Sequence, residues 1–460
     1  MITDSLIICY HFLCYSKKYI DARKDLKMDN KEILMINREY RNILNAIRCK
    51  PGIEKTVLAK QLNLAYKTLA KQLDDLEEIN FIDTEPELQI NKNKFLLCGL
   101  SIGGSQCKVI FIDAEYHILS AEIFDKICED YGIFKQDFFA SKKNSTAYGY
   151  KYFETPSNRT QLKVYINYII KDIVKLYDIS LSNKKIPPIL SIGIALTGSV
   201  DIYKQVIVRS HNIEYMKNIS REMLLEPDTI QDLKNRDIEL VIDHNAKAMA
   251  VCEKFSLYHI DNENHEYAHK KNIACFYLGS GIGCGIILDN RLVRGCRNFS
   301  GELGHIQVPR YPGLQNININ ESCTCGAQNC LEHLIIHDVF EMNRNDFKRA
   351  TSEEILKKIE SFEQEGEEKY TQKMQILGYY IGWAIDSITK LLNVGLIIFS
   401  GKMTCFMTKA WSYLEPTVGD LDYAILDCQT VLSKYGMLAP SIGAAILSTY
   451  APNEPVEWII

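Results

Sequence analysis

A short stretch rich in metal-ligand residues, between positions 301 and 332, constrains the fold of this chain more than any other part. Three cysteines, Cys323, Cys325 and Cys330, fall within eight residues there, and His305 precedes them. Thiolates and imidazoles are the ligands that Zn²⁺ prefers, and four of them without a carboxylate form a closed tetrahedral site of the structural kind. The alternative is three free cysteines in a loop. The glycine at position 326 and the glutamates flanking the motifs favour the metal site.

Two motifs in this stretch resemble the signature of the ROK family, which comprises repressors, open reading frames and sugar kinases. The first reads GELGH from position 301, and the second reads CTCGAQNCLE from position 323. The resemblance implies that a structural zinc is held by His305, Cys323, Cys325 and Cys330. It also implies that Glu302 and Glu332 face a sugar. Asn329 stands where the family usually has glycine, which is a mild departure because asparagine tolerates a left-handed turn.

The composition is that of a globular protein in a reducing compartment. The length of 460 residues is enough for about three domains, and 47% hydrophobic with 24% charged residues excludes a disordered or fibrous chain. A net charge of −5 means that any nucleic-acid-binding surface must be local. Fifteen cysteines without a disulfide framework favour the cytoplasm, and no stretch is apolar for long enough to span a bilayer.

The resemblance covers nearly the whole chain after the N-terminus and implies an α/β protein. We expect an N-terminal winged helix-turn-helix followed by a two-lobed, actin-like (ribonuclease-H-like) ROK body. Residues 1–38 are interpreted as an extension of uncertain order, and residues 39–92 as the winged helix-turn-helix. Residues 93–212 are expected to form the first lobe, to which a C-terminal helix within residues 436–460 returns. Residues 213–435 are expected to form the second lobe with the zinc site.

The N-terminal domain carries the periodicity of three short helices and a hairpin. Apolar residues recur at helical spacing from position 40 to 47, and a second short helix is predicted at residues 57–62. The third helix follows a tight turn, as does the helix that enters the major groove in helix-turn-helix proteins. Near its start lie the residues that we expect to contact DNA, Tyr66, Lys67, Thr68 and Lys71. Residues 81–83 and 88–90 are the predicted wing. The alternative is a three-helix bundle used for protein contact.

The first lobe is predicted to open with three strands, at residues 95–102, 108–112 and 118–123, which is the opening meander of the actin-like fold. Residues 125–160 show no clean period and are interpreted as an irregular excursion. A helical pattern returns at residues 162–179.

Two glycine-rich segments resemble the phosphate loops of the family's kinases. Glycines there let backbone N–H groups approach a phosphate closely. Taken alone, a glycine-rich hairpin is a weak signal, so the assignment rests on the resemblance. The residues concerned are Gly103, Gly104, Ser105, Gly279, Ser280, Gly281 and Gly283.

Asp243 follows a predicted strand at residues 238–242 and begins the run DHNAKAMA. This run resembles a motif whose aspartate is the catalytic base in the kinases, although an aspartate at a helix start is more often just an N-cap. The resemblance implies a sugar site made of Asn212, Asp243, Glu302, His305 and Glu332.

Other positions depart from the kinase pattern. Ser101 replaces a carboxylate of the first phosphate motif, and Mg²⁺ prefers such hard anionic ligands. Lys402 and Met403 put bulky side chains into an adenosine loop that is usually glycine-rich, and Ile242 replaces an asparagine that touches the sugar. Phosphoryl transfer needs all of these parts together, so Asp243 is predicted to be a vestige of the catalytic base.

The sequence therefore predicts a transcriptional regulator similar to the family's xylose-type and N-acetylglucosamine-type repressors. Its expected partners are operator DNA, a sugar or sugar phosphate, and a second copy of the chain, because palindromic operators need two helix-turn-helix units. Its expected cofactor is a structural Zn²⁺. One alternative is an active sugar kinase with a fused DNA-binding head. Another is a degenerate sugar-binding protein whose N-terminal bundle only mediates assembly.

Overall fold

The structure is a computed structural model. It describes residues 38–140, 147–183, 185–210, 212–259, 262–314, 323, 325–404, 407, 413, 428–451 and 454–458. The predicted extension lies outside these residues except for its last position.

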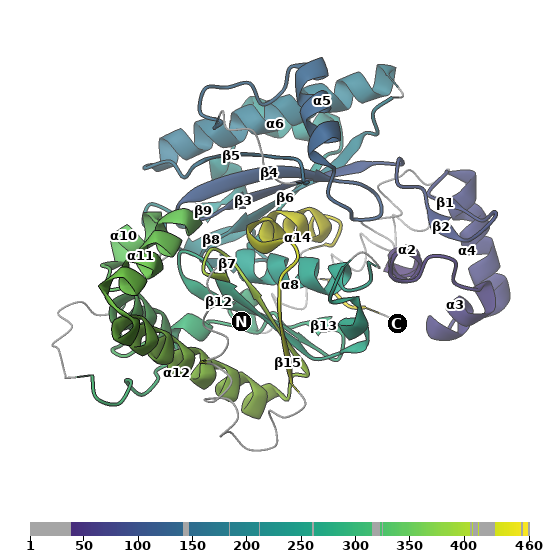
Figure 1. Ribbon diagram of the computed structural model, residues 1–460. Coiled ribbons are helices and arrows are strands. Elements are labelled where there is room, and N and C mark those ends of the chain that lie inside the picture. The colour runs from purple at the N-terminus through teal and green to yellow at the C-terminus, as the bar shows by residue number, and fades with distance from the viewer. Residues whose placement is uncertain are drawn as a thin grey trace, which may run out of the picture.

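The N-terminal unit consists of three helices and a two-stranded hairpin (Figure 1). The apolar faces of the helices form one buried cluster that includes Ile43, Leu58 and Leu69. The two strands pair antiparallel with Ile82 opposite Ile90, so the predicted hairpin is present. The elements are α2 (Arg38–Cys49), α3 (Lys55–Gln61), α4 (Tyr66–Glu78), β1 (Ile82–Asp83) and β2 (Gln89–Ile90).

The first lobe is built on a five-stranded sheet with the order β10-β6-β3-β4-β5. Strands β10, β6 and β3 run parallel, whereas β4 and β5 join as antiparallel neighbours. The strands are β3 (Leu96–Ile102), β4 (Gln106–Ile112), β5 (Tyr150–Glu154), β6 (Ile189–Leu196) and β10 (Glu239–His244). The helices of this part are α5 (Ala121–Tyr131), α6 (Arg159–Ser182) and α7 (Pro227–Asn235).

The strand predicted at residues 118–123 is wrong. Ile118 makes only an isolated bridge to Ile112, and Ser120 then caps α5 by accepting a hydrogen bond from the backbone N–H of Ile123 at 3.4 Å. A serine N-cap followed by an acidic first turn stabilises a helix more than a strand here. The third strand of the meander is β5, which lies inside the segment predicted to be irregular.

The second lobe contains another five-stranded sheet, with the order β13-β12-β11-β14-β15. A small three-stranded sheet, β7-β8-β9, packs instead in the core of the first lobe, where Val200, Ile207 and Ile219 are buried. The strands are β7 (Ser199–Asp201), β8 (Val206–Arg209), β9 (Lys217–Ser220), β11 (Ile273–Leu278), β12 (Ile282–Leu288), β13 (Arg291–Leu292), β14 (Leu396–Ser400) and β15 (Gln429–Leu432). The helices are α8 (Asn245–Ser256), α9 (Leu331–Leu334), α10 (Arg344–Arg349), α11 (Ser352–Glu365) and α12 (Glu367–Leu392).

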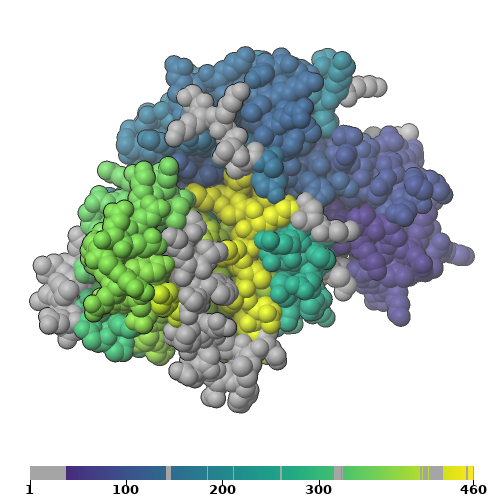
Figure 2. Space-filling model, viewed as in Figure 1, coloured from purple at the N-terminus to yellow at the C-terminus, as the bar shows by residue number. Residues whose placement is uncertain are grey.

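Helix α14 (Ala439–Leu447) lies between the first sheet and α8, at the centre of the molecule (Figure 1). Its close approach depends on glycine: a Cβ atom at Gly443 would lie 1.6 Å from the carbonyl oxygen of Ala248. Gly443 lies in the middle of this helix. The C-terminal part of the chain therefore lies between the two lobes, as its yellow surface shows in Figure 2.

The N-terminal unit is joined to the body through α2 and the residues that follow α14. Arg41 is 1% exposed; it donates to the carbonyl oxygen of Thr449 at 3.0 Å and forms an ion pair with Glu454. Asn45 donates to the hydroxyl of Tyr450 at 2.8 Å. Because these polar contacts are buried, moving α2 relative to the C-terminal segment would leave charged groups unpaired. None of the described helices is long and apolar enough to cross a membrane.

Candidate functional site between the lobes

A polar cavity opens where residues of both lobes meet. Four of the five predicted sugar-binding residues line it, namely Asn212, Glu302, His305 and Glu332. The other lining residues are Thr197, Gly198, Ser199, His244, Asn245, Tyr277, Gly281, Ile282, Gly283 and Arg344. Convergent polar groups in a concave site of this kind are typical of small-molecule recognition.

Glu332 lies in the first turn of α9 and is held on both sides of its carboxylate. One oxygen accepts from the backbone N–H of Ile282 at 2.7 Å, and the other accepts from the guanidinium of Arg344 at 2.8 Å. A Cβ atom at Gly281 would lie 2.6 Å from Oε2 of Glu332 and 2.8 Å from Nδ2 of Asn212, so a larger residue there would displace these two side chains. The sequence did not predict Arg344, since nothing local distinguishes it from a solvated helix-end arginine.

Glu302, in the first motif, lines the cavity with an exposed side chain. Desolvation within the cavity raises the pKa of its carboxyl group, and the nearby charges of Lys247 and His305 oppose that shift. Lys247 is fully buried, and its ammonium donates to the carbonyl oxygen of Ser300 at 2.7 Å. Burial lowers the pKa of Lys247 to about 8, against the opposing effect of Asp243 and Glu302. A cation therefore lies near Glu302 and favours the ionised form of its carboxyl group.

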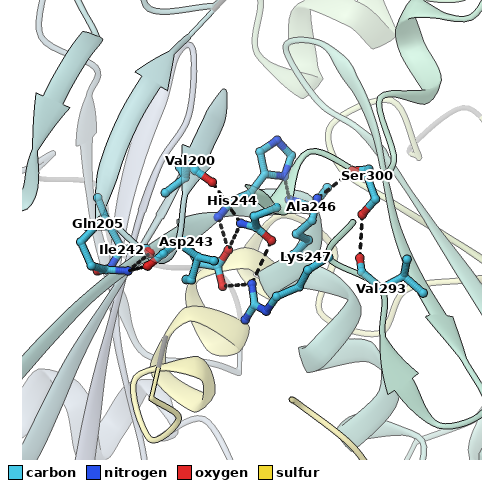
Figure 3. Close-up of polar contacts among 12 residues, drawn as sticks. Val200, Gln205, Ile242, Asp243, His244, Ala246, Lys247, Val293 and Ser300 are labelled. Atoms are coloured by element: carbon cyan, nitrogen blue, oxygen red, sulfur yellow. Dashed lines mark hydrogen bonds and ion pairs between the residues drawn. The ribbon is translucent and has the colours of Figure 1, made fainter. Parts of the chain in front are cut away.

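Asp243 is not among the residues that line the cavity, because its carboxylate is paired elsewhere (Figure 3). One oxygen accepts from Arg294 at 2.8 Å, and the other accepts from Asn298 at 2.8 Å and from the backbone N–H of His244 at 2.7 Å. The aspartate is 1% exposed. With three hydrogen bonds accepted from within the protein, the carboxylate is positioned as a structural acceptor. The sequence did not predict Arg294 or Asn298 as its partners.

His244 takes the place beside the cavity that was expected for Asp243. Its Nδ1 accepts from the backbone N–H of Ala246 at 3.2 Å and so caps α8 (Figure 3). Burial lowers the pKa of His244 to about 3, aided by Lys247 and opposed by Asp243. The imidazole is therefore neutral at physiological pH, with Nε2 as its remaining polar atom.

The four predicted metal ligands come together at the wall of this cavity. The Sγ atom of Cys323 lies 3.3 Å from Nδ1 of His305, and the Sγ atoms of Cys325 and Cys330 lie 3.4 Å apart. All four ligand atoms lie within 4.8 Å of one another. Tetrahedral zinc with bonds of about 2.0–2.3 Å separates its ligands by roughly 3.3–3.8 Å. The cluster can therefore hold a metal ion, and its donor set fits Zn²⁺.

The protonation of the cluster also suits a metal. Burial raises the pKa of the Cys323 thiol, but the hydrogen bond with His305 and other donors outweigh it, so that its pKa falls to about 6. A thiolate is the form of cysteine that binds metals. His305 belongs to both the cluster and the cavity, and Glu332 follows Cys330 by two positions. A bound ion would thus fix two residues of the cavity wall.

The two glycine-rich hairpins face each other across a second, smaller cavity. Gly103, Ser105, Gly279 and Ser280 line it, together with Asn245 and Tyr277, which also line the first cavity. Gly104 lies at the closest approach of the hairpins: its Cβ would lie 2.9 Å from that of Ser280. Of the predicted phosphate-loop residues, only Gly281 and Gly283 line the first cavity instead.

The two bulky residues of the expected adenosine loop differ in where they lie. Lys402 lines the second cavity, and its ammonium donates to the carbonyl oxygens of Phe347 and Ala350. Burial lowers the pKa of Lys402 to about 7, and Glu354 opposes that shift. Met403 is buried in the hydrophobic core of the second lobe. Of these two residues, only Lys402 lines the second cavity and takes up space in it.

The residues predicted to contact DNA lie exposed on the first half of α4. Tyr66 is 52% exposed, and Lys67, Thr68 and Lys71 are exposed as well. In the second, acidic half of α4, Asp75 accepts a hydrogen bond from the hydroxyl of Tyr40 at 2.6 Å and so contributes to packing within the N-terminal unit. The surface near the start of α4 is therefore the basic one.

Together these features define a two-lobed α/β protein with a polar cavity between its lobes and a cysteine–histidine cluster at the cavity wall. The sequence profile of the ROK family matches residues 126–450. The chain belongs to the ROK family.

Curated relatives include both regulators and enzymes. The chain is 23% identical over 307 residues to the xylose repressor of Caldicellulosiruptor bescii, which covers 63% of this chain and 62% of that protein. It is 24% identical over 173 residues to the N-acetyl-D-glucosamine kinase of Yersinia enterocolitica, covering 36% of this chain and 53% of that enzyme. The chain thus spans about three fifths of the length of the repressor and about half of the kinase.

A solved structure of a ROK family transcriptional regulator, described as a homologue of the E. coli MLC protein, is similar over most of the chain. The TM-score is 0.61 at 18% identity, and the match covers 88% of this chain and 94% of the other. At this identity the similarity shows a shared fold.

Proposed function

We propose that this protein is a sugar-responsive, DNA-binding transcriptional repressor of carbohydrate-metabolism genes. One observation carries the proposal: a continuous packed path joins the sugar cavity to the N-terminal helices. Asn245 lines the cavity and starts α8, α8 packs on α14, and the segment after α14 holds Arg41 of α2. A ligand that favours one arrangement of the lobes can therefore bias the position of the DNA-binding helices.

The remaining parts of the proposal follow from the site. A sugar would be held by Asn212, Glu302 and Glu332, whose oxygens and amide suit paired hydroxyl groups. Zn²⁺ bound by the cysteine–histidine cluster would fix His305 and Glu332 in the cavity wall. A homodimer would place two copies of α4 on a palindromic operator.

The DNA-binding surface can be tested with Lys67→Ala and Lys71→Ala. Each variant should weaken binding to a duplex selected from a random pool, because each removes a cation from the exposed start of α4. If each lysine contacts a phosphate, the slope of log affinity against log salt should become shallower by about one unit per lysine. Lys171→Ala, on exposed α6, is the matched control and should leave affinity unchanged. An unchanged affinity and salt slope in the double variant would contradict this surface.

A second candidate function, sugar phosphorylation, is favoured by the kinase relatives and by the retained Asp243. Against it, the carboxylate of Asp243 pairs with Arg294 and does not line the cavity, and Ser101 replaces the carboxylate on the metal side. A base contributes about 10²–10⁴-fold, and losing charge stabilisation of the phosphoryl group removes factors of similar size.

We therefore expect no phosphotransfer above background in a coupled ADP-release assay with hexoses, pentoses and N-acetyl sugars. Asp243→Asn should show the same background rate as the unaltered protein. Turnover near roughly 1 s⁻¹ that is lost in Asp243→Asn would establish a kinase and overturn the regulator proposal.

A further inference from the structure

The tight turn that follows β4 carries three potential metal ligands, Asp113, Glu115 and His117. One ligand atom of each residue lies within 4.8 Å of the others, and Nδ1 of His117 is 3.5 Å from Oε2 of Glu115. The turn fixes this spacing, because Oδ1 of Asp113 accepts from the backbone N–H groups of Glu115 at 2.9 Å and of His117 at 3.0 Å. The three side chains are therefore held together before any ligand binds.

A second histidine completes a cluster of four residues. His259 follows the C-terminal end of α8 by three positions, and its ring lies against that of His117 with the centroids 4.1 Å apart. Two imidazolium cations this close would repel each other, so at least one ring is neutral and offers a nitrogen lone pair to a metal. We call these four residues, Asp113, Glu115, His117 and His259, the turn cluster.

The charge and exposure of the turn cluster suit a divalent cation. With both rings neutral, its two carboxylates outweigh the single nearby charge of Lys92, which acts on Glu115. The side chain of His117 is 44% exposed and that of Glu115 is 26% exposed, so an ion reaches the cluster without opening the fold. An ion pair of His117 with Glu115 explains the contact between those two residues, but it does not explain why a second imidazole lies against the first.

The ligand atoms decide the class of metal. Imidazole nitrogens together with carboxylate oxygens suit Zn²⁺, Co²⁺ and Ni²⁺, whereas Mg²⁺ prefers oxygen ligands alone. No thiol belongs to the turn cluster, in contrast to the cysteine–histidine cluster. We therefore expect the turn cluster to hold its ion less tightly, so that mild chelation removes this ion and leaves zinc on the cysteines.

The turn cluster lies where the body holds the N-terminal unit. In the same turn, the carbonyl oxygen of Ala114 accepts from Arg48 of α2 at 2.7 Å. The guanidinium of Arg48 lies over the ring of Tyr116, with its Cζ atom 4.0 Å from the ring centroid. The same ring packs edge-on against Phe255 of α8 at 5.1 Å. An ion that joins the turn to the end of α8 would therefore also stiffen the support of α2.

We propose that the turn cluster binds one divalent transition metal ion, at a second metal site separate from the cysteine–histidine cluster. The two imidazoles supply its nitrogen ligands, and the carboxylates of Asp113 and Glu115 supply its oxygen ligands. Its binding needs neither sugar nor DNA and is therefore independent of the proposed function.

The experiment is a Co²⁺ titration of the full-length protein after a wash with a mild chelator that leaves zinc on the cysteines. We expect one further equivalent of Co²⁺ to bind, with visible d–d absorption but without the charge-transfer band that a thiolate ligand produces. Zn²⁺ should displace this ion, and Mg²⁺ in large excess should not. His117→Ala and His259→Ala should each weaken Co²⁺ binding by more than about 10-fold, since even an outer-shell partner typically contributes that factor.

The matched control is His269→Ala, which changes an exposed histidine of η3 (His265–His269) and should bind Co²⁺ normally. Without added metal, the variants should melt as the unaltered protein does; should His259→Ala melt lower, His259→Gln, which keeps the bulk of the side chain, replaces it. Added Zn²⁺ should raise the melting temperature of the control but not of His117→Ala, because an ion stabilises only the protein that binds it. The proposal is overturned if no further equivalent of Co²⁺ binds, if that equivalent shows the thiolate band, or if a folded variant of His117 or His259 binds it as the unaltered protein does.

Discussion

Cys325→Ser is expected to lower both the zinc content and the stability of the protein. Purified protein should contain about one equivalent of zinc, and the variant markedly less. Cys325 is exposed, and its Sγ atom contacts that of Cys330 at 3.4 Å. If the cysteines were merely free thiols, serine at this exposed position would be nearly neutral. If they bind zinc, several kcal/mol should be lost, because structural zinc contributes about 10–16 kcal/mol in zinc-finger peptides.

The matched control for this prediction is Cys296→Ser, which changes another exposed cysteine outside the cluster. Its metal content and melting temperature should equal those of the unaltered protein. Metal analysis and thermal unfolding at neutral pH measure both quantities. Full zinc occupancy in a variant that lacks all three cysteines of the cluster would contradict the site. Cys325→Ser should also weaken sugar binding. Glu332 lines the cavity and follows Cys330 by two positions, so loss of the metal would leave this glutamate less firmly held.

The second large effect is expected for Glu302→Gln. This variant keeps the shape of the side chain and removes a carboxylate that lines the cavity beside Lys247. A charge-assisted hydrogen bond to a sugar hydroxyl contributes about 1.5–3 kcal/mol, so the sugar affinity should fall by about 10- to 100-fold. The effect of the sugar on operator binding should disappear at concentrations that saturate the unaltered protein, while operator binding itself persists.

A thermal-shift screen over pentoses, hexoses and N-acetyl sugars would first identify the ligand, because a ligand at 100 times its Kd adds about 2.7 kcal/mol. Glu129→Gln, on the exposed surface of α5, is the control and should respond to the sugar normally. A normal sugar response in Glu302→Gln would exclude the site as described. If Glu302→Gln failed to bind the operator even when no sugar is present, Glu302 would instead be needed for the stability of the fold.

The regulatory proposal depends on the contacts that hold α2 to the body. Arg41, Asn45 and Arg48 are all buried there, and Arg48 donates to the carbonyl oxygen of Ala114 at 2.7 Å. Ion pairs exposed on the surface would stabilise the contact between α2 and the body only weakly. Because these groups are buried, losing one partner would leave the other unpaired in the interior, which is strongly unfavourable. The N-terminal unit is therefore positioned by the body rather than tethered loosely to it.

Local patterns were enough to predict much of this protein. The helical periodicity from position 40 onwards, the alternation and glycine turns of the strands, and the Cys-x-Cys-x4-Cys spacing each depend on residues close in sequence. The N-terminal helices, the β3–β4 hairpin and the cysteine–histidine cluster were predicted for that reason. The strand predicted at residues 118–123 failed because the cap at Ser120 outweighed an apolar run of strand-forming residues.

Only the tertiary structure decided which groups meet across the chain. Asp243 pairs with Arg294 and Asn298, Glu332 with Arg344, and Arg41 with a segment more than 400 positions away. The pattern of apolar and polar residues along the sequence does not predict these pairs, because they depend on how the two sheets and α14 pack together. Burial and long-range pairing set the chemistry of these side chains, and both arise from the tertiary fold.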